Sequence, residues 1–194
     1  MNDGLIQEQH YTYEEWLKMD IEGRSELIDG QIYMMADPTE KHQLVSGELY
    51  GQIWSYLKGK PCLIFYAPYS VRLFDSYNTA YEPDIVVLCD QSKRRNRGCV
   101  GAPDMIIEIL SPSTAKNDKV TKKQDYMKAG VKEYWIVDPE HNFVDAYRLV
   151  DDRYFQQTYC KGDMAPVQIL PDCVVDLSLV FRDTAEAAYT DSSH

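Results

Sequence analysis

The chain has 194 residues, 44% of them apolar, a size that suits one domain around one core. Its 31 acidic and 20 basic residues give a formal net charge of −11, which argues against tight, non-specific binding of nucleic acid through a generally basic surface. The sequence has no apolar stretch of membrane-spanning length, and its start lacks the pattern of a signal peptide. We therefore expect a cytoplasmic protein without a membrane partner.

The five cysteines have no metal-binding or redox spacing. They stand at positions 62, 89, 99, 160 and 173, with no Cys-x-x-Cys pair and no histidine close by. We expect buried, reduced thiols rather than a zinc site or a redox dithiol.

The N-terminal segment predicts a short helix followed by a hairpin. Thr12 and Glu15 have the spacing of a capping box, and the helix should end near Gly23. The pair Asp29-Gly30 lies between two apolar runs and predicts a two-residue hairpin turn. Glu26 then lies at the start of the first hairpin strand.

A long helix is expected from residue 39 to about 58, because apolar residues recur there with a helical period. His42 lies on the same side of this helix as Val45. A histidine in such a place is more often a partly buried core or surface residue than a ligand, and a functional role is the alternative. Strands are expected around 62–66 and 69–74.

Two carboxylates lie within strands of core type. Asp84 follows a proline near the start of an apolar strand over 81–88, and Glu108 lies near the end of another over 105–110. Both share a strand face with apolar residues. If the strands are antiparallel neighbours joined by the loop 89–104, the start of one lies beside the end of the other. The two carboxylates would then meet.

Paired inward carboxylates have three interpretations. They can hold a divalent cation, share a proton as an acid–base pair, or form two separate salt bridges. An acid–base pair is the least favoured, because a lysine-rich helix follows Glu108 and favours ionised carboxylates. Structural ion pairs also bury acids, so the salt-bridge interpretation stays open.

The segment after Glu108 predicts a strand–helix–strand unit. Ser113 or Thr114 can cap a helix that runs to about Ala129 and stops at Gly130. A strand over 133–137 follows, and such a crossover should place it parallel to the Glu108 strand. Further hairpin strands are expected at 143–150 and 153–160.

Four lysines lie on the half of this helix that should pack against the sheet: Lys116, Lys119, Lys122 and Lys123. Their stems can cover apolar surface while their charges reach water, and Asp118 with Lys122 forms a favourable helical pair. Alternatively, one lysine reaches the nearby carboxylates and positions a water or neutralises a phosphate. The spacing does not choose among the four.

A basic patch lies in the loop 89–104. It consists of Lys93, Arg94, Arg95 and Arg97. These residues can contact nucleic acid, or they can form a solvated loop that keeps the protein soluble.

With these motifs in view, the chain resembles the Uma-two family of restriction-endonuclease-like proteins, part of the PD-(D/E)xK nuclease superfamily. The match spans roughly residues 11 to 180. Each motif alone is weak, but their order along the chain is specific. The matching segments are Ser25 to Gly30, the start of the His42 helix, Glu82-Pro83-Asp84, Glu108 to Thr114, and Tyr126 to Pro139.

The resemblance implies an α/β (α+β) fold with a restriction-endonuclease-like mixed central sheet flanked by helices, an N-terminal hairpin and C-terminal β-hairpins. A single nuclease-like domain would cover residues 1–183, before a frayed polar tail at 184–194. Nucleases of this fold often dimerise, which implies a homodimer.

The resemblance also selects one lysine. The third motif of the superfamily is an acid, any residue and a lysine, but here Leu110 holds the lysine position. The chain is similar to family members whose lysine lies in the following helix. The matching position is Lys122, four residues before Tyr126.

The implied activity is metal-assisted hydrolysis of phosphodiester bonds, with DNA as the expected substrate. Asp84, Glu108 and the Ile109 carbonyl would hold Mg²⁺ or Mn²⁺. Lys122 would orient the attacking water or stabilise the phosphate charge. Glu26, the N-terminal acid of the family, would bind a second metal or steer that lysine.

Tyr126 and His42 are expected in supporting roles, as phosphate contacts or behind the ligands. Two other functions compete with an endonuclease. One is a nuclease-fold binding or scaffold protein without turnover, which the acidic charge favours. The other is a soluble oligomer whose carboxylates serve ion pairing alone, which predicts a melting temperature that does not depend on metal.

Overall fold

The computed structural model describes residues 10–74, 78–111 and 118–182, and the backbone alone at Asp118 and Lys119. Four expectations lie outside these residues: the helix cap at Ser113 or Thr114, Lys116, the side chain of Lys119 and the tail at 184–194.

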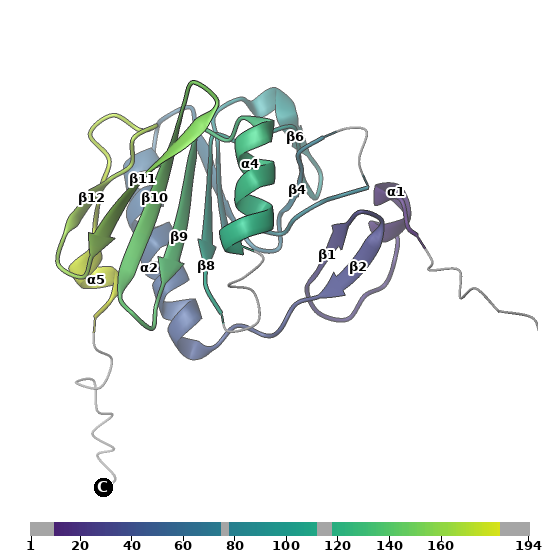
Figure 1. Ribbon diagram of the computed structural model, residues 1–194, viewed down its shortest axis with the longest axis horizontal. Helices are drawn as coiled ribbons and strands as arrows, with labels where there is room; N and C mark the ends of the chain where they lie inside the picture. The colour runs from purple at the N-terminus through teal and green to yellow at the C-terminus, as the bar shows by residue number, and fades with distance from the viewer. Residues whose placement is uncertain (1–9, 75–77, 112–117, 183–194) are drawn as a thin grey trace, which may run out of the picture.

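A six-stranded mixed sheet forms the centre of the molecule, with the strand order β11-β10-β9-β8-β5-β3 (Figure 1). β8 and β9 are parallel and the other neighbouring pairs are antiparallel. The expected mixed sheet is therefore confirmed. Its strands are β3 (Leu63–Tyr66), β5 (Ile85–Leu88), β8 (Met105–Ile109), β9 (Glu133–Asp138), β10 (Phe143–Val150) and β11 (Arg153–Cys160).

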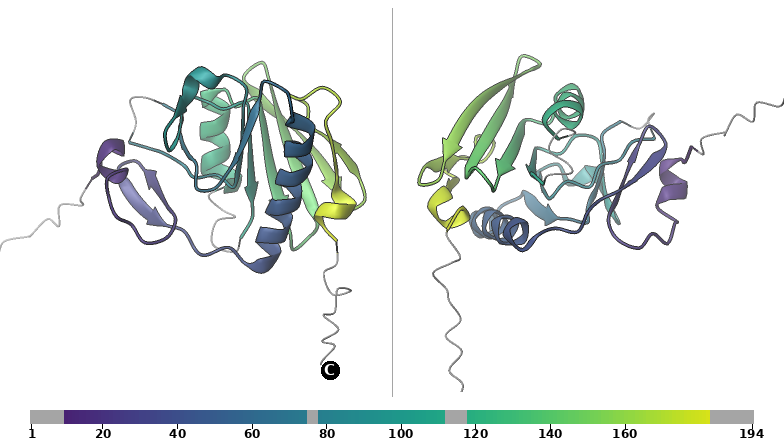
Figure 2. Two further views of the ribbon diagram at one scale, coloured as in Figure 1. Left: turned by 180° about the vertical axis from the view of Figure 1, so that it is seen from behind. Right: turned by 60° about the horizontal axis from the view of Figure 1, so that its bottom comes forward.

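Helices cover both faces of this sheet (Figure 2). The long helix α2 (Glu40–Leu57) buries Val45, Leu49 and Ile53 against one face. The opposite face is covered by α4 (Lys123–Ala129), whose Tyr126 joins a second apolar cluster. Each face thus has its own core.

A wide turn precedes α4. The segment η2 (Asp118–Lys122) is one turn of π-helix, a form that is frequent at functional sites. Gly130 then ends α4 with a positive φ of 90°, the left-handed conformation expected of a glycine stop.

The N-terminal segment lies beside the sheet as a separate small layer (Figure 1). The capping box of Thr12 and Glu15 is present, but α1 (Tyr13–Trp16) ends well before Gly23. The expected length was wrong: after Trp16 the Lys18 and Met19 amides bond three residues back instead of four, and the Leu17 carbonyl accepts a hydrogen bond from Arg97.

The hairpin of β1 (Ser25–Ile28) and β2 (Gln31–Met34) follows α1. Asp29 and Gly30 both have positive φ, as the predicted two-residue turn requires. Bridges continue from Leu27 to Ala80 and from Val71 to Tyr81. Because Tyr81 pairs with Val71, the strand expected from residue 81 begins only at Ile85, so Asp84 directly precedes β5.

A small sheet joins the loops next to the hairpin, in the order β4-β7-β6. Its strands are β4 (Ser70–Arg72), β7 (Gly98–Val100) and β6 (Arg94–Arg95), the last following the 3-10 turn η1 (Gln91–Lys93). Near the C-terminus, β12 (Met164–Pro166) and β13 (Val174–Asp176) form another pair before α5 (Leu177–Val180). The C-terminal pair and α5 add Ala165, Val175 and Leu177 to the core that contains the buried residues of α2.

The cysteines correct one expectation. Cys62 and Cys89 form a disulfide, although reduced thiols were expected. The β3–β5 register pairs Leu63 with Leu88, so the next residues outward, Cys62 and Cys89, come together; this pairing is not readable from their spacing. Cys99 and Cys173 are buried thiols as expected, whereas Cys160 is exposed. No helix in the described part of the chain is long and apolar enough to cross a membrane.

Candidate functional site

The two strand carboxylates lie side by side, as their positions predict. In the β5–β8 register Ile85 pairs with Ile107, and one step further Asp84 stands opposite Glu108. The Ile109 amide donates a hydrogen bond to Asp84 Oδ2 at 2.8 Å. Asp84 and Glu108 are only 6% and 2% exposed, so both acids need charged or polar partners.

Lys122 supplies a shared cation. Its Nζ lies 2.7 Å from Glu26 Oε1 and 3.1 Å from Glu108 Oε1, and the side chain is almost completely buried. Lys123, the next residue, instead lies over the ring of Tyr147. The hairpin, the sheet and the helical segment therefore meet at one ammonium group.

The helical segment also brings Tyr126 to Glu108 Oε1, the oxygen that Lys122 contacts. The Tyr126 hydroxyl donates to Glu108 Oε1 at 2.9 Å. Lys122 and Tyr126 are four residues apart, a spacing that places two side chains on one helix face. Burial and the nearby charge of Glu108 raise the pKa of Tyr126 well above its ordinary value. The phenol is therefore a neutral, permanent donor.

Glu26 is held from two directions. Its Oε1 accepts the backbone amide of Glu82 at 3.1 Å in addition to the Lys122 ammonium. Glu26 is the second residue of β1, so the tight hairpin turn fixes where its carboxylate lies.

His42 and Arg24 hold Asp84. Thr39 caps α2 by accepting the amide of His42, which places this histidine in the first helical turn. His42 Nε2 lies 3.2 Å from Asp84 Oδ2, and an Arg24 guanidinium nitrogen lies 3.4 Å from Oδ1. Burial alone raises the pKa of Asp84, but His42, the Ile109 amide and Arg24 outweigh it and lower that pKa below its ordinary value. Asp84 is thus an ionised carboxylate.

Sequence reasoning missed Arg24. It precedes β1 and lies two residues from Glu26, a spacing that puts both side chains on one face of an extended chain. That spacing was the available signal.

The donor atoms suit a hard divalent cation. Asp84 Oδ2 has two hydrogen-bond partners, whereas Oδ1 has the longer 3.4 Å contact with Arg24. The N–H and C=O of one residue leave a strand on the same side, so the Ile109 carbonyl faces the side of Asp84. Two carboxylates and a carbonyl are the oxygen ligands that Mg²⁺ and Mn²⁺ favour. Among the described residues, no three His, Cys, Asp or Glu side chains cluster as a metal site, so such a site would need the carbonyl.

The basic patch lies elsewhere. Asp84 stands before the first residue of β5, and the loop with Lys93, Arg94 and Arg95 leaves from the other end of that strand. Four strand residues separate the two positions by roughly 13 Å. Lys93 donates to the Ala102 carbonyl, and Arg95 to backbone carbonyls of its own loop. These three bases do not join the carboxylates.

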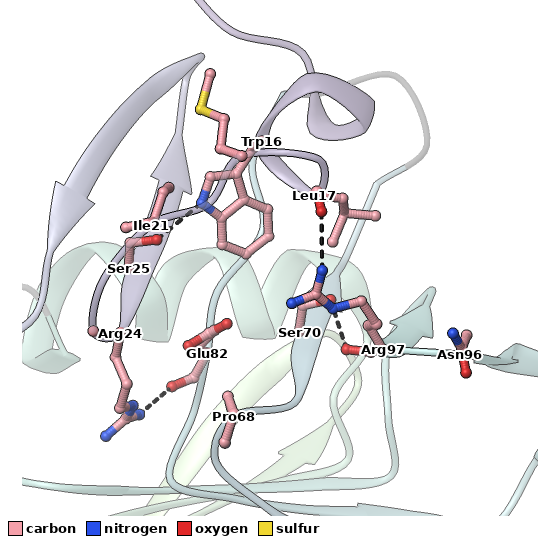
Figure 3. A pocket seen from close by; sticks show the side chains of 12 residues that line it. Trp16, Leu17, Ile21, Arg24, Ser25, Pro68, Ser70, Glu82, Asn96 and Arg97 are labelled. Atoms are coloured by element: carbon pink, nitrogen blue, oxygen red, sulfur yellow. Dashed lines mark hydrogen bonds between the residues drawn. The ribbon is translucent and has the colours of Figure 1, made fainter.

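Arg97 lines a separate pocket of about 350 Å³ between the N-terminal segment and the small sheet (Figure 3). Its guanidinium donates to the Leu17 carbonyl at 2.9 Å. Trp16 and Ser25 also line this pocket, and the Trp16 indole N–H donates to the Ser25 hydroxyl. Arg24 also lines this pocket and donates to the Glu82 carbonyl at 2.8 Å. The pocket therefore adjoins the carboxylate cluster through Arg24, without containing Asp84 or Glu108.

Two further cavities lie at the carboxylates. A small one of about 30 Å³ is lined by Asp84, Glu108 and Lys122. A larger groove of about 430 Å³ begins at Asp84 and His42 and follows α2. A small ion or water and a larger ligand could thus reach Asp84 together.

A family model described as "Putative restriction endonuclease" matches residues 11–179, which include the hairpin, the central sheet and both helices around the cluster. The chain belongs to the Uma2 (Uma-two) family. The resemblance noted in the sequence is confirmed, and the restriction-endonuclease-like fold class with it.

Two individual proteins are similar to this chain. A crystal structure of "a putative nuclease belonging to DUF820" from Anabaena variabilis matches with a TM-score of 0.71 and 27% identity, over 88% of this chain and 97% of that chain. The "Uncharacterized protein slr1290" of Synechocystis is 29% identical over 142 residues, which are 72% of this chain and 74% of that protein. The descriptions of the family model and of the Anabaena structure both name a nuclease activity, and that of the Synechocystis protein names none.

Proposed function

We propose that this Uma2 protein is a divalent-metal-dependent endonuclease that hydrolyses phosphodiester bonds in DNA. The observation that carries the proposal is the meeting of Asp84 and Glu108 beside Lys122, with every one of these side chains buried. Lys122 comes from the helical layer and is buried between Glu26 and Glu108, and this gathering of charge from separate layers supports a functional site over separate structural ion pairs.

Asp84, Glu108 and the Ile109 carbonyl would hold Mg²⁺ or Mn²⁺, which supplies Lewis-acid stabilisation of the charge that develops on a phosphate. His42 and the Ile109 amide keep Asp84 ionised and fixed in place. Tyr126 holds Glu108 in place by donating to Oε1. The ligands would therefore be preorganised before a cation binds.

Lys122 is proposed to act on the substrate side. Its ammonium can orient the attacking water or meet the charge that develops on the phosphoryl oxygens. Glu26, at 2.7 Å from Nζ, fixes the position of that ammonium, which supports the steering role rather than a second metal site. The basic side chains Lys93, Arg94 and Arg95 would bind more distant parts of the substrate backbone.

The metal site can be tested without turnover. A few millimolar Mg²⁺ or Mn²⁺ should raise the melting temperature of the parent by about 5–10 °C, if the metal exceeds its dissociation constant about a hundredfold. Asp84→Asn should lose this increment. Asp104→Asn is the matched control, since Asp104 is also a buried aspartate next to a central strand but binds the Cys89 amide and Lys132. A metal increment that survives in Asp84→Asn would contradict the proposed ligand set.

Cleavage of plasmid and oligonucleotide DNA with Mg²⁺ tests catalysis. Lys122→Ala should reduce the rate by about a hundredfold or more. Lys123→Ala, the adjacent lysine that lies over Tyr147, should change it only a few-fold. Metal binding without cleavage would favour the second candidate, a nuclease-fold binding protein, which the net charge of −11 supports.

A homodimer is also proposed on the family resemblance, because nucleases of this fold often dimerise. Sedimentation analysis at several protein concentrations measures the mass directly. A monomer at all concentrations would exclude paired sites.

A further inference from the structure

The groove beside Asp84 has the features of a base-binding site. Its volume of about 430 Å³ lies at the lower end of the range of small-molecule pockets, enough for one nucleoside but not for a section of duplex. One wall is the first half of α2 and the other is the end of β3.

An aromatic pair forms part of its wall. Tyr66, the last residue of β3, is 63% exposed although it is a large aromatic residue next to a cavity. Tyr50 of α2 contacts it edge to face, with ring centroids 5.2 Å apart and planes at 87°. This contact favours one orientation of the Tyr66 ring, which stays largely exposed.

The groove adjoins the proposed reaction centre. Asp84 and His42 line both the groove and the small cavity that reaches Glu108 and Lys122. A phosphate at the carboxylates would therefore have its attached nucleoside beside the tyrosine wall. Stacking on a ring is also tolerant of the negative net charge, which weakens long-range attraction of phosphates.

We propose that this groove binds one unstacked nucleobase of the strand that is cut, with Tyr66 as the stacking platform. This inference rests on the proposed nuclease function and adds its substrate class. A base inside a continuous duplex has both faces covered by its neighbours, so Tyr66 can stack only on a base that is single-stranded, unpaired at a junction, or flipped out. Single-stranded or locally unpaired DNA is thus preferred over continuous duplex.

Two glycines of α2 give a matched pair of tests. A Cβ added at Gly47 or at Gly51 meets nothing within 4 Å, and both positions lie inside the helix, where replacing glycine favours helix formation. Gly47 lines the groove and Gly51 does not. Gly47→Leu should therefore fill the groove without harm to the fold, while Gly51→Leu makes the same change one turn away.

The probe is a fluorescein-labelled single-stranded DNA oligonucleotide of about twelve nucleotides, measured by anisotropy with Ca²⁺ in place of Mg²⁺, so that the oxygen ligands hold a cation while cleavage is suppressed. Gly47→Leu and Tyr66→Ala should each weaken binding about tenfold, the usual effect of losing one stacked base. Gly51→Leu and Tyr66→Phe, which keeps the ring, should bind like the parent. The same oligonucleotide annealed to its complement should bind more weakly.

The outcomes separate the two proposals. Cleavage by the parent, with equal binding of both strand forms and no effect of Gly47→Leu or Tyr66→Ala, would overturn the base-binding groove and leave the nuclease intact. A parent that binds no single strand would also overturn the groove. Loss of single-strand binding in both groove variants, without cleavage by the parent, would support the groove and refute the nuclease. Tyr66 is largely exposed, so Tyr66→Ala remains informative if Gly47→Leu does not fold.

Discussion

The two ends of the parallel strand pair β8 and β9 both bury acids, but they satisfy them differently. At the start of the pair, Glu133 accepts the Trp135 indole at one oxygen and the Ile169 amide at the other. At the far end of β8, Glu108 receives an ammonium and a phenol on the same oxygen. The first arrangement completes a fold, while the second gathers charge from separate layers at one point.

Asp104 and Asp84 repeat this contrast. One carboxylate oxygen of Asp104 accepts a hydrogen bond from the Cys89 amide, and the other pairs with Lys132, whose side chain is 66% exposed. Asp84 has a long contact from Arg24 on one oxygen, at the edge of a cavity. Burial and charge alone therefore do not identify a site in this protein. The kind of partner and its origin in the chain are more informative.

The largest difference between the two ends should appear in the free energy of unfolding when Lys122 or Lys132 is replaced. Lys122→Met leaves Glu26 and Glu108 buried without their shared cation and should lower the free energy of unfolding by about 3–5 kcal/mol. Lys132→Met removes an exposed partner and should cost about 1 kcal/mol or less. Urea unfolding without metal measures both. Equal losses would remove the distinction between the two ends.

A smaller difference is expected between two tyrosine hydroxyls. Tyr126→Phe removes a donor to the charged Glu108 and should cost about 1.5–3 kcal/mol. Tyr154→Phe removes a donor to the neutral Val131 carbonyl and should cost about 0.5–1.5 kcal/mol. Chemical denaturation of the two variants under one set of conditions gives the comparison. A larger loss at Tyr154 would count against a charged Glu108.

The smallest effect concerns acid pH, where the ends should respond with opposite sign. The lowered pKa of Asp84 means that its stabilisation is present above the ordinary value of about 4 and is lost as the pH falls through the lower folded value. Burial outweighs its hydrogen bonds and raises the pKa of Glu133, so its ionisation costs stability that is regained on acidification.

The stability difference between the parent and Asp84→Asn should therefore shrink below about pH 4. Unfolding curves across this range measure that difference, and carboxyl NMR titration assigns each group. A pKa of Asp84 higher than that of Glu133 would contradict the predicted order.

Local patterns predicted much of the fold. The Asp29-Gly30 turn, the helix from residue 39 and the strands of the last hairpin follow from turn chemistry and from hydrophobic period. The adjacency of Asp84 and Glu108 followed from strand order, because antiparallel neighbours bring a start beside an end.

Long-range choices were not predictable in this way. Helical spacing left four lysines equivalent, and the family resemblance singled out Lys122. The Leu17 carbonyl, which follows α1, accepts a hydrogen bond from Arg97, 80 residues away in the chain. The contact of Arg24 with Asp84 and the disulfide of Cys62 depend equally on which segments meet in space. Each of these contacts joins residues far apart in the chain, so its partner is set by the assembled fold and not by a local pattern.

Lys122 comes from the wide turn η2 and not from a strand. The proposed chemistry therefore depends on the packing of this helical segment against the sheet, which brings Lys122 to Glu108. If the segment 118–129 detached while the sheet stayed folded, Glu26 and Glu108 would lose their cation and Glu108 its phenol together. The competent state would then be a subset of the native ensemble, and amide exchange in α4 would measure its population. The local unfolding free energy of one short helix would set the fraction of molecules able to react.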